Sequence, residues 1–209
     1  MKKVYFALPI IAVFLAFISV QGQINSISKE HSLSNMGNKS KEKTLPLSRN
    51  EKILVAYFSH SGNTREIANQ IHKKAGGDIF EIQPVKPYPN DYDAVVKQAQ
   101  EEQAAHYKPV LKTKIENIKS YDVVFIGYPN WWGTIPPPVR TFLSTYDFSG
   151  KTIVPFCTHE GSGLGQSVKE ISKLCPKSTI LNGLAVRGSD VHKAQNEVSQ
   201  WLHKIKITK

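Results

Sequence analysis

The fold is decided by one stretch, KILVAYFSHSGNT at residues 52–64. Residues 52–58 form a nearly continuous apolar run, which is typical of a strand buried on both faces of a parallel sheet. Residues 59–64 form a hydroxyl-rich turn with one Gly, and a helical pattern follows over 65–75. The first N–H groups of a helix lack intrahelical partners and lie at the positive end of its dipole. The stretch therefore predicts a site for an anion such as phosphate.

The rest of the chain alternates strands with helices. Further apolar or alternating runs predict strands at 78–83, 122–127, 151–157 and 179–186. Helical patterns occupy 91–105, 139–146, 165–174 and 190–204. Five strands alternating with helices predict an α/β fold, a doubly wound parallel sheet with helices on both faces.

The first fifty residues differ in composition from the rest. Two Lys residues precede an apolar run at 4–20, after which the chain is polar again. This order predicts an export signal at 1–23, with an uncleaved membrane anchor as the alternative. Residues 24–50 are rich in Ser, Asn and Lys, and they predict a flexible linker. We expect the folded domain to span 51–209 and to lie in the periplasm or to face it.

Composition and charge exclude several functions. The formal net charge is +10, but residues 51–209 carry 20 Lys and Arg against 15 Asp and Glu, a net of +5, and no run alternates basic with aromatic residues. We therefore expect no nucleic-acid binding.

The His and Cys residues do not indicate a metal site or a disulfide. The seven His residues have no metal-ligand spacing, so no metal site is expected. Cys157 ends a strand and Cys175 follows the helix that returns antiparallel to it, which predicts two separate buried thiols.

Ligands of a doubly wound sheet bind outside the carboxyl ends of its strands. Three loops occupy this position, at 59–64, 128–138 and 158–165. The first offers the hydroxyls of Ser59, Ser61 and Thr64 but no Lys, so a phosphate would be held there and not transferred. A capped turn without a ligand is the alternative, because helix N-caps favour the same residues.

The two other loops suit a flat ring. The second places Trp131 and Trp132 in a segment that cannot be regular helix, and exposed aromatics on such loops stack against planar ligands. We expect one of these two Trp side chains to pack under the loop. The third loop, THEGSGLG at 158–165, is Gly-rich, so its backbone can approach the edge of a heteroaromatic ring; a mobile surface turn is the alternative. Together the loops predict a ligand with a phosphate tail and a flat head, and FMN fits best.

These residues resemble the flavodoxin family. The pattern S-x-S-G-x-T at 59–64, after a buried strand, is similar to its phosphate-binding signature. With PNWWG at 129–133 and THEGSG at 158–163, the chain resembles more narrowly the flavodoxin-like domains found as single-domain bacterial proteins. The resemblance covers residues 52–204. It implies a strand order of 2-1-3-4-5 and noncovalently bound FMN.

The resemblance also implies which residues contact the cofactor. The first loop would hold the phosphate, the second would contact the isoalloxazine ring, and the third would line the ring's other edge. The matching positions are Ser59, His60, Ser61, Gly62, Asn63 and Thr64 in the first loop, Pro129, Asn130, Trp131, Trp132 and Gly133 in the second, and Thr158, Gly161, Ser162 and Gly163 in the third.

Two departures from the family leave the function open. The third loop has no aromatic residue, so one face of the ring would be open, and the domain is basic where flavodoxins are acidic. Electron transfer to an unidentified redox partner is the expected function.

The first alternative is an FMN-dependent oxidoreductase acting on NAD(P)H or a small quinone, with His159 or Tyr128 supplying a proton. The scarcity of nicotinamide cofactors outside the cytoplasm argues against it. The second is a non-enzymatic module that binds FMN or another phosphate ligand.

Overall fold

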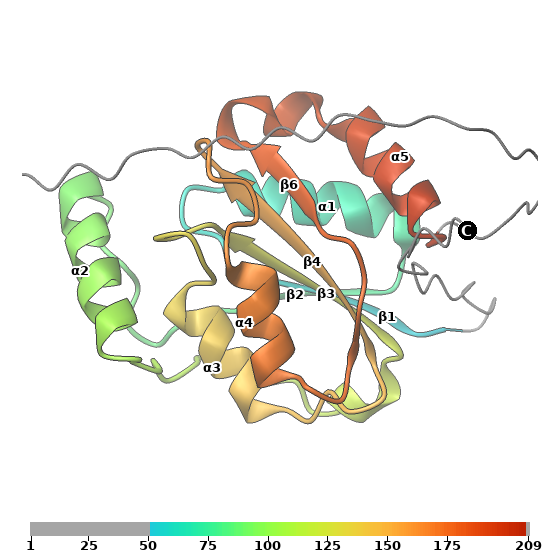
Figure 1. Cartoon of the computed structure of the whole chain (residues 1–209), viewed down its shortest axis with the longest axis horizontal. Coiled ribbons are helices and arrows are strands. Elements are labelled where there is room, and N and C mark those ends of the chain that lie inside the picture. The colour runs from blue at the N-terminus through green and yellow to red at the C-terminus, as the bar shows by residue number, and fades with distance from the viewer. Residues whose placement is uncertain (1–50, 208–209) are drawn as a thin grey trace, which may run out of the picture. The chain divides into compact units, whose positions relative to one another are not determined.

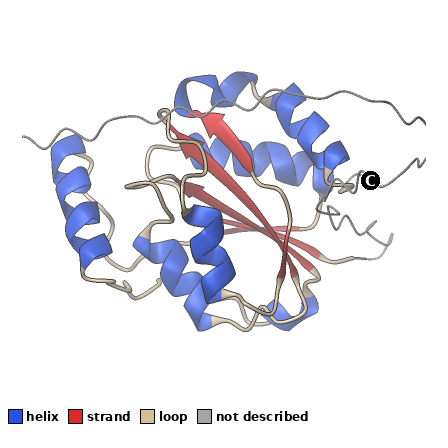
Figure 2. Ribbon diagram, viewed as in Figure 1, coloured by secondary structure: helices blue, strands red, loops and turns tan. Residues whose placement is uncertain are grey.

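A parallel sheet lies at the centre of the part of the chain that the computed structural model describes, residues 51–207. The expected export signal at 1–23 and the expected linker at 24–50 lie outside these residues. No helix in the described part is long and apolar enough to span a bilayer. Figures 1 and 2 show the strands running through the middle, with helices packed on both sides.

All strand pairs are parallel, and the strands follow the order β2-β1-β3-β4-β5, with β6 also paired to β4. This confirms the predicted 2-1-3-4-5 order. The strands are β1 (Ile53–Tyr57), β2 (Asp78–Glu81), β3 (Val123–Pro129), β4 (Thr152–His159), β5 (Thr179–Ile180) and β6 (Leu184–Arg187).

Helices cover both faces of the sheet, as predicted. The α-helices are α1 (Asn63–Ala75), α2 (Tyr92–Ala104), α3 (Pro137–Thr145), α4 (Ser167–Leu174) and α5 (Gln195–Lys204). Helices α1 and α5 pack together on one face, and α3 and α4 on the other. Two 3₁₀ segments, η1 (Ile118–Ser120) and η2 (Gly188–Lys193), complete the described part. The predicted last helix at 190–204 is therefore α-helical only from Gln195.

The apolar run of β1 is continuous because both of its faces are buried. Leu54 and Ala56 belong to the core under α3 and α4, whereas Val55 and Tyr57 belong to the core under α1 and α5. All four are at most 5% exposed. Successive side chains of a strand point to opposite faces, so a strand between two helical layers has no polar side.

The predicted fifth strand at 179–186 is broken into β5 and β6. Ile153 of β4 pairs with Ile180, and Phe156 pairs with Leu184, so four steps along the outer strand oppose three along β4. One extra residue on one strand is a β-bulge. Pro155 lies in β4 opposite this break, and proline has no N–H to donate to the ladder.

Helix α2 does not cover the sheet. Figure 1 shows it beyond the carboxyl ends of the strands, and Gln103 near its end is hydrogen-bonded to Arg140 of α3. The chain enters and leaves this region through an antiparallel bridge between Pro84 and Leu111, beside which the Val85 amide donates to the carbonyl of Val110 at 2.8 Å. Helix α2 therefore forms a side wall at the edge of the sheet where ligands are expected.

Candidate functional site

The turn between β1 and α1 is built around Ser59 and Gly62. Gly62 is the N-cap of α1 and has a φ of +97°, a conformation that favours glycine. The Ser59 Oγ accepts hydrogen bonds from the amides of Gly62 and Arg65, both at 3.2 Å. The amides of Asn63 and Thr64 have no hydrogen-bond partner among the described residues. The turn is thus capped by its own Ser and still presents free N–H groups to an anion.

Two neighbouring side chains at the start of α1, Thr64 and Arg65, interact with other parts of the chain. Thr64 is buried, and its Oγ1 lies 2.8 Å from the Oγ1 of Thr158, which joins the first loop to the third. Arg65 forms an ion pair with Glu81 at 2.5 Å on the surface. The start of α1 therefore offers an anion neutral donors and no cation of its own.

Trp131 and Trp132 occupy a tight turn in the second loop. The backbones of Trp131 and Thr134 exchange two hydrogen bonds of 3.1 Å, and the two central residues have φ values of +52° and +78°, as in a type I′ turn. Trp131 packs edge-on against Phe58 and Tyr88, with ring centroids 5.4 and 4.9 Å away. Trp132 is 54% exposed. One Trp packs under the loop and the other stays open, as predicted.

The third loop packs directly on the second. Asn130 Nδ2 donates to the Gly163 carbonyl at 2.6 Å, and the Gln166 amide donates to the Gly133 carbonyl at 2.7 Å. A Cβ at Gly165 would lie 2.3 Å from that same Gly133 oxygen. The two loops approach this closely because residue 165 has no side chain.

A polar network around the buried Arg140, behind the Trp turn, joins this turn to α2, α3 and α4. Arg140 donates from Nε to Glu170 Oε1 at 2.6 Å and from Nη2 to Gln103 Oε1 at 2.7 Å. The Thr134 hydroxyl donates to the other oxygen of the Glu170 carboxylate. Gln103 Nε2 donates in turn to the Ile135 carbonyl at 2.8 Å. This network was not predicted, because its partners are 30 to 37 residues apart in the sequence.

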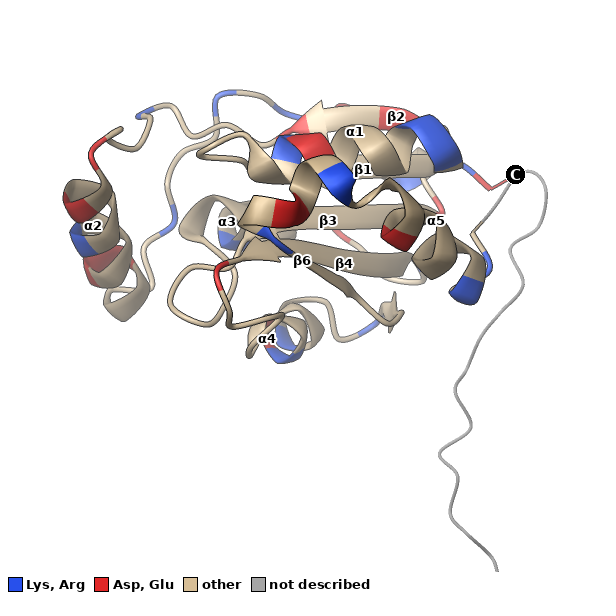
Figure 3. Ribbon diagram, turned by 90° about the horizontal axis from the view of Figure 1, so that it is seen from above, with Lys and Arg blue, Asp and Glu red and all other residues tan. Residues whose placement is uncertain are grey.

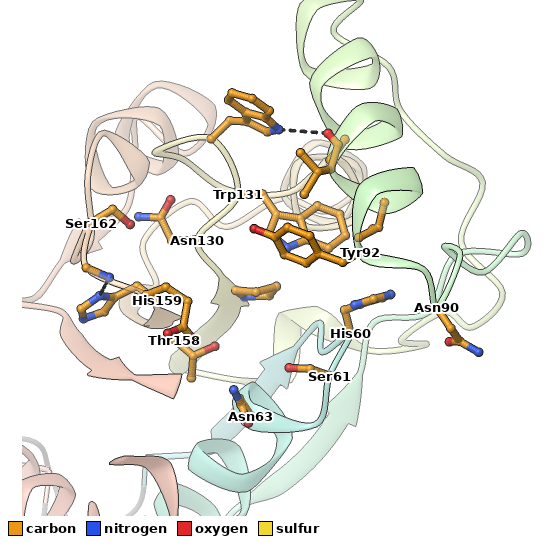
Figure 4. A pocket seen from close by; sticks show the side chains of 17 residues that line it. His60, Ser61, Asn63, Asn90, Tyr92, Asn130, Trp131, Thr158, His159 and Ser162 are labelled. Carbon is orange, nitrogen blue, oxygen red and sulfur yellow. Dashed lines mark hydrogen bonds between the residues drawn. The ribbon is translucent and has the colours of Figure 1, made fainter. Parts of the chain in front are cut away.

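The three loops and α2 enclose a pocket of about 740 Å³ at the carboxyl ends of β1, β3 and β4. This volume is typical of small-molecule sites, about 300–1,000 Å³. Figure 4 shows Ser61 and Asn63 at one end, and Trp131 and Tyr92 at the other. The loops contribute His60, Ser61, Asn63, Pro129, Asn130, Trp131, Trp132, Thr158, His159, Glu160, Gly161 and Ser162, and the α2 region contributes Asn90, Tyr92, Val95, Val96 and Ala99.

Little charge lies inside the pocket. Within residues 51–207, no Lys or Arg and only one acidic residue, Glu160, line it. The Arg187 side chain donates to the backbone carbonyl of Glu160 at 3.3 Å. Helix α2 carries residues of both signs (Figure 3). The described part of the chain holds no group of three or more His, Cys, Asp or Glu side chains that could bind a metal ion.

Three polar side chains give the pocket defined donors and acceptors. His60 Nε2 lies 2.8 Å from the Pro89 carbonyl, which can only accept, so this nitrogen carries a proton. His159 Nδ1 accepts the Gly161 amide at 2.9 Å, which leaves the proton of the neutral ring on Nε2. The Asn130 Oδ1 is buried and has no hydrogen-bond partner among the described residues.

Tyr128 does not reach the pocket. It is fully buried in the core under α3 and α4, and its hydroxyl donates to Ser167 Oγ at 2.7 Å. Burial raises the pKa of this hydroxyl. The expectation that Tyr128 could supply a proton to a ligand is therefore wrong, because this position of β3 faces the core.

Cys157 and Cys175 are both buried free thiols, as predicted. Burial raises the pKa of Cys157 to about 12 and that of Cys175 to about 11. The Cys157 Sγ lies 3.3 Å from the Gly163 carbonyl, just behind the third loop. Both thiols are therefore protonated and inert at neutral pH.

The predicted site residues fall into two groups. Ten line the pocket, namely His60, Ser61, Asn63, Pro129, Asn130, Trp131, Trp132, Thr158, Gly161 and Ser162. The other five, Ser59, Gly62, Thr64, Gly133 and Gly163, shape the loops instead. Sequence reasoning missed Glu160 and the contribution of α2. The one signal for α2 was a polar helix that carries the apolar residues Val95, Val96 and Ala99 together.

The sheet order and the three loops define a doubly wound α/β protein with its ligand site at the point where strand order reverses. A family model described as flavodoxin matches residues 52–205. The chain belongs to the flavodoxin family.

Solved structures agree with this assignment. The chain is similar to a Bacteroides eggerthii protein assigned to the flavoproteins, with 36% identity, a TM-score of 0.67, and 75% of this chain and 98% of that chain covered. A Bacteroides uniformis protein with the same assignment has 32% sequence identity and a TM-score of 0.66, and the match covers 73% of this chain and 98% of that chain. A Lactobacillus acidophilus flavoprotein in complex with FMN shares the fold, with 22% identity and a TM-score of 0.57. The match covers 68% of this chain and 97% of that chain. No curated protein matches the chain.

Proposed function

We propose that this protein binds FMN noncovalently in the pocket and uses it to transfer electrons. The observation that carries the proposal is that the free amides at the start of α1 and the Trp turn meet in one pocket. A phosphate and a flat ring joined in one molecule match its two ends. Membership of the flavodoxin family supports the same cofactor.

The chain's own groups divide the binding between them. The Asn63 and Thr64 amides and the Ser61 hydroxyl hold the phosphate, and the Trp turn supports the ring. The Asn130 Oδ1 fits an N–H at the ring's edge, because a buried acceptor without a donor costs about 1–3 kcal/mol. Neutral donors suit a phosphate that stays bound, since phosphoryl transfer needs cations.

Electron transfer is supported by the open rim of the pocket. FMN supplies reversible one- and two-electron chemistry when it is bound. Trp132 at the rim is 54% exposed, and the third loop carries no aromatic side chain to cover a ring. A ring held there has an edge close to solvent, where a redox partner can approach without any side chain having to react.

Stepwise reduction of the purified, FMN-loaded protein with dithionite tests this function. Electron transfer predicts a third visible spectrum at one electron per protein, different from both the oxidised and the fully reduced spectra. A protein that is colourless as purified and takes up no added FMN would refute cofactor binding, and the binding-module function would then stand.

A second candidate function, an FMN-dependent oxidoreductase, rests on the open third loop and on His159. The His159 ring lines the pocket and carries its proton on Nε2, where it can donate to a bound molecule. This function predicts that NADPH or a reduced quinone alone bleaches the protein in one two-electron step. A protein that only dithionite reduces would exclude it.

We also propose that the protein is exported. The support is the basic start and the apolar run at 4–20. Fractionation of producing cells, with mass spectrometry of the mature N-terminus, tests this. A processed periplasmic form is expected, an unprocessed membrane-bound form indicates the anchor, and an unprocessed cytoplasmic form contradicts export.

A further inference from the structure

One wall of the pocket is apolar and does not come from the three ligand loops. Tyr92, Val95, Val96 and Ala99 of α2 line it, and we call these four residues the α2 wall. Val95 and Ala99 are 7% and 2% exposed, whereas Tyr92 is 76% exposed. An aromatic side chain that lines a pocket and stays open there can stack against a planar ligand.

The α2 wall is held in place from both sides. The Trp132 Nε1 donates to the Val96 carbonyl at 3.2 Å, which joins the Trp turn to the middle of α2 (Figure 4). Further along the helix, Glu102 accepts the Tyr88 hydroxyl at 2.5 Å and Gln103 is part of the polar network around Arg140. Hydrogen bonds therefore fix the α2 wall in position as one side of the pocket.

The charges of the pocket limit what can lie against this wall. No Lys or Arg among residues 51–207 lines the pocket, and its one acidic residue, Glu160, belongs to the third loop. A dinucleotide brings a diphosphate, which needs cations or free amides, and the free amides at α1 are taken by the phosphate of FMN. An uncharged molecule has no such need and gains from apolar burial.

We propose that the α2 wall is a binding subsite for a second, uncharged planar ring of the quinone class, next to the FMN. The subsite rests on the proposed function, because it names the small molecule that shares the pocket with the cofactor. Tyr92 supplies a flat surface for such a ring, and Val96 and Ala99 supply apolar contact.

Binding of 1,4-naphthoquinone to the FMN-loaded full chain, measured by calorimetry, tests the subsite, with NADH as the charged comparison. We expect naphthoquinone to bind one site and NADH to bind more weakly. Val96→Glu places a charge in the wall and should weaken naphthoquinone binding by about tenfold or more. Gln100→Glu adds the same charge at an exposed position of α2 outside the pocket, so binding should not change.

The FMN affinity of each variant, measured first by flavin fluorescence, separates the two proposals. If wild type does not bind FMN, the proposed function fails and the subsite fails with it. If FMN binds but naphthoquinone does not, or binds wild type and Val96→Glu equally, only the subsite is refuted. Tyr92→Ser, at a largely exposed side chain, gives a second variant in case Val96→Glu does not fold, and it should also weaken naphthoquinone binding.

Discussion

Replacing Gly62 with Val should remove phosphate binding from the first turn. A residue other than glycine at the φ of +97° is strained by about 1–3 kcal/mol. A Cβ at Gly62 meets no protein atom within 4 Å, so the strain would be relieved by a change in the turn itself, which moves the free amides of Asn63 and Thr64 that follow Gly62 directly. Each hydrogen bond from an amide to a charged phosphate contributes about 1.5–3 kcal/mol. Losing both should weaken FMN binding by at least about a hundredfold.

Gly150→Val is the matched control. Gly150 has a φ of +77° and open space around its Cβ position, but it precedes the amino end of β4, away from the pocket. Urea unfolding should report a similar loss of stability in both variants, whereas titration of flavin fluorescence should report weaker FMN binding in Gly62→Val alone. Unchanged FMN affinity in Gly62→Val would refute the phosphate site, and equal weakening in both variants would assign the effect to strain.

Four further predictions concern the site and the core behind it. Glu170→Ala leaves the Arg140 guanidinium buried without its carboxylate, and because Glu170 is 23% exposed we expect a loss of about 2–3 kcal/mol in urea unfolding; no loss would show that the pair is solvated. Gly165→Ala should force the second and third loops apart and weaken FMN binding, while a variant that binds FMN normally would contradict their close packing. Cys157 and Cys175 should react with a thiol reagent at pH 8 only after unfolding. Because burial raises the pKa of Cys157 from 9.0 to about 12, the unfolded state loses this proton first, so the contribution of Cys157 to stability is complete below pH 9 and should fall by about 1.4 kcal/mol per pH unit between pH 9 and about 12; the stability of Cys157→Ala should fall less steeply.

The sheet could be predicted because the pattern of apolar and polar residues in each strand follows from which of its faces are buried. Val55 and Tyr57 face one helical layer while Leu54 and Ala56 face the other, so β1 reads as apolar throughout. Parallel strands place their carboxyl ends at one edge, so the three loops could be brought together before their contacts were known. The different burial of Trp131 and Trp132 could also be predicted, since a short turn cannot bury two adjacent large side chains.

The walls of the pocket could not be predicted, because they depend on contacts between distant segments. Helix α2 has the composition of an ordinary surface helix, and only its position beyond the strand ends makes Val96 a lining residue. Arg140 is a single basic residue after three prolines, and its partners lie on other helices, 30 and 37 residues away. Tyr128 lies in β3, one residue beyond the strand that the sequence predicts at 122–127, so its direction toward the core was not predicted.

The β-bulge opposite Pro155 determines which of the two hydrophobic cores the side chains of the outer strand pack into. Ile180, before the bulge, packs with the core under α3 and α4, whereas Leu184 and Val186, an even number of residues further on, pack with the core under α1 and α5. An uninterrupted strand would have sent all three the same way. The length of this segment is therefore one residue greater than a regular strand needs. Removing one residue between Ile180 and Leu184 would leave three steps opposite three along β4, so the strand could pair without a bulge and keep the same side chains in each core, whereas removing two would leave it one residue short and turn Leu184 and Val186 to the wrong face.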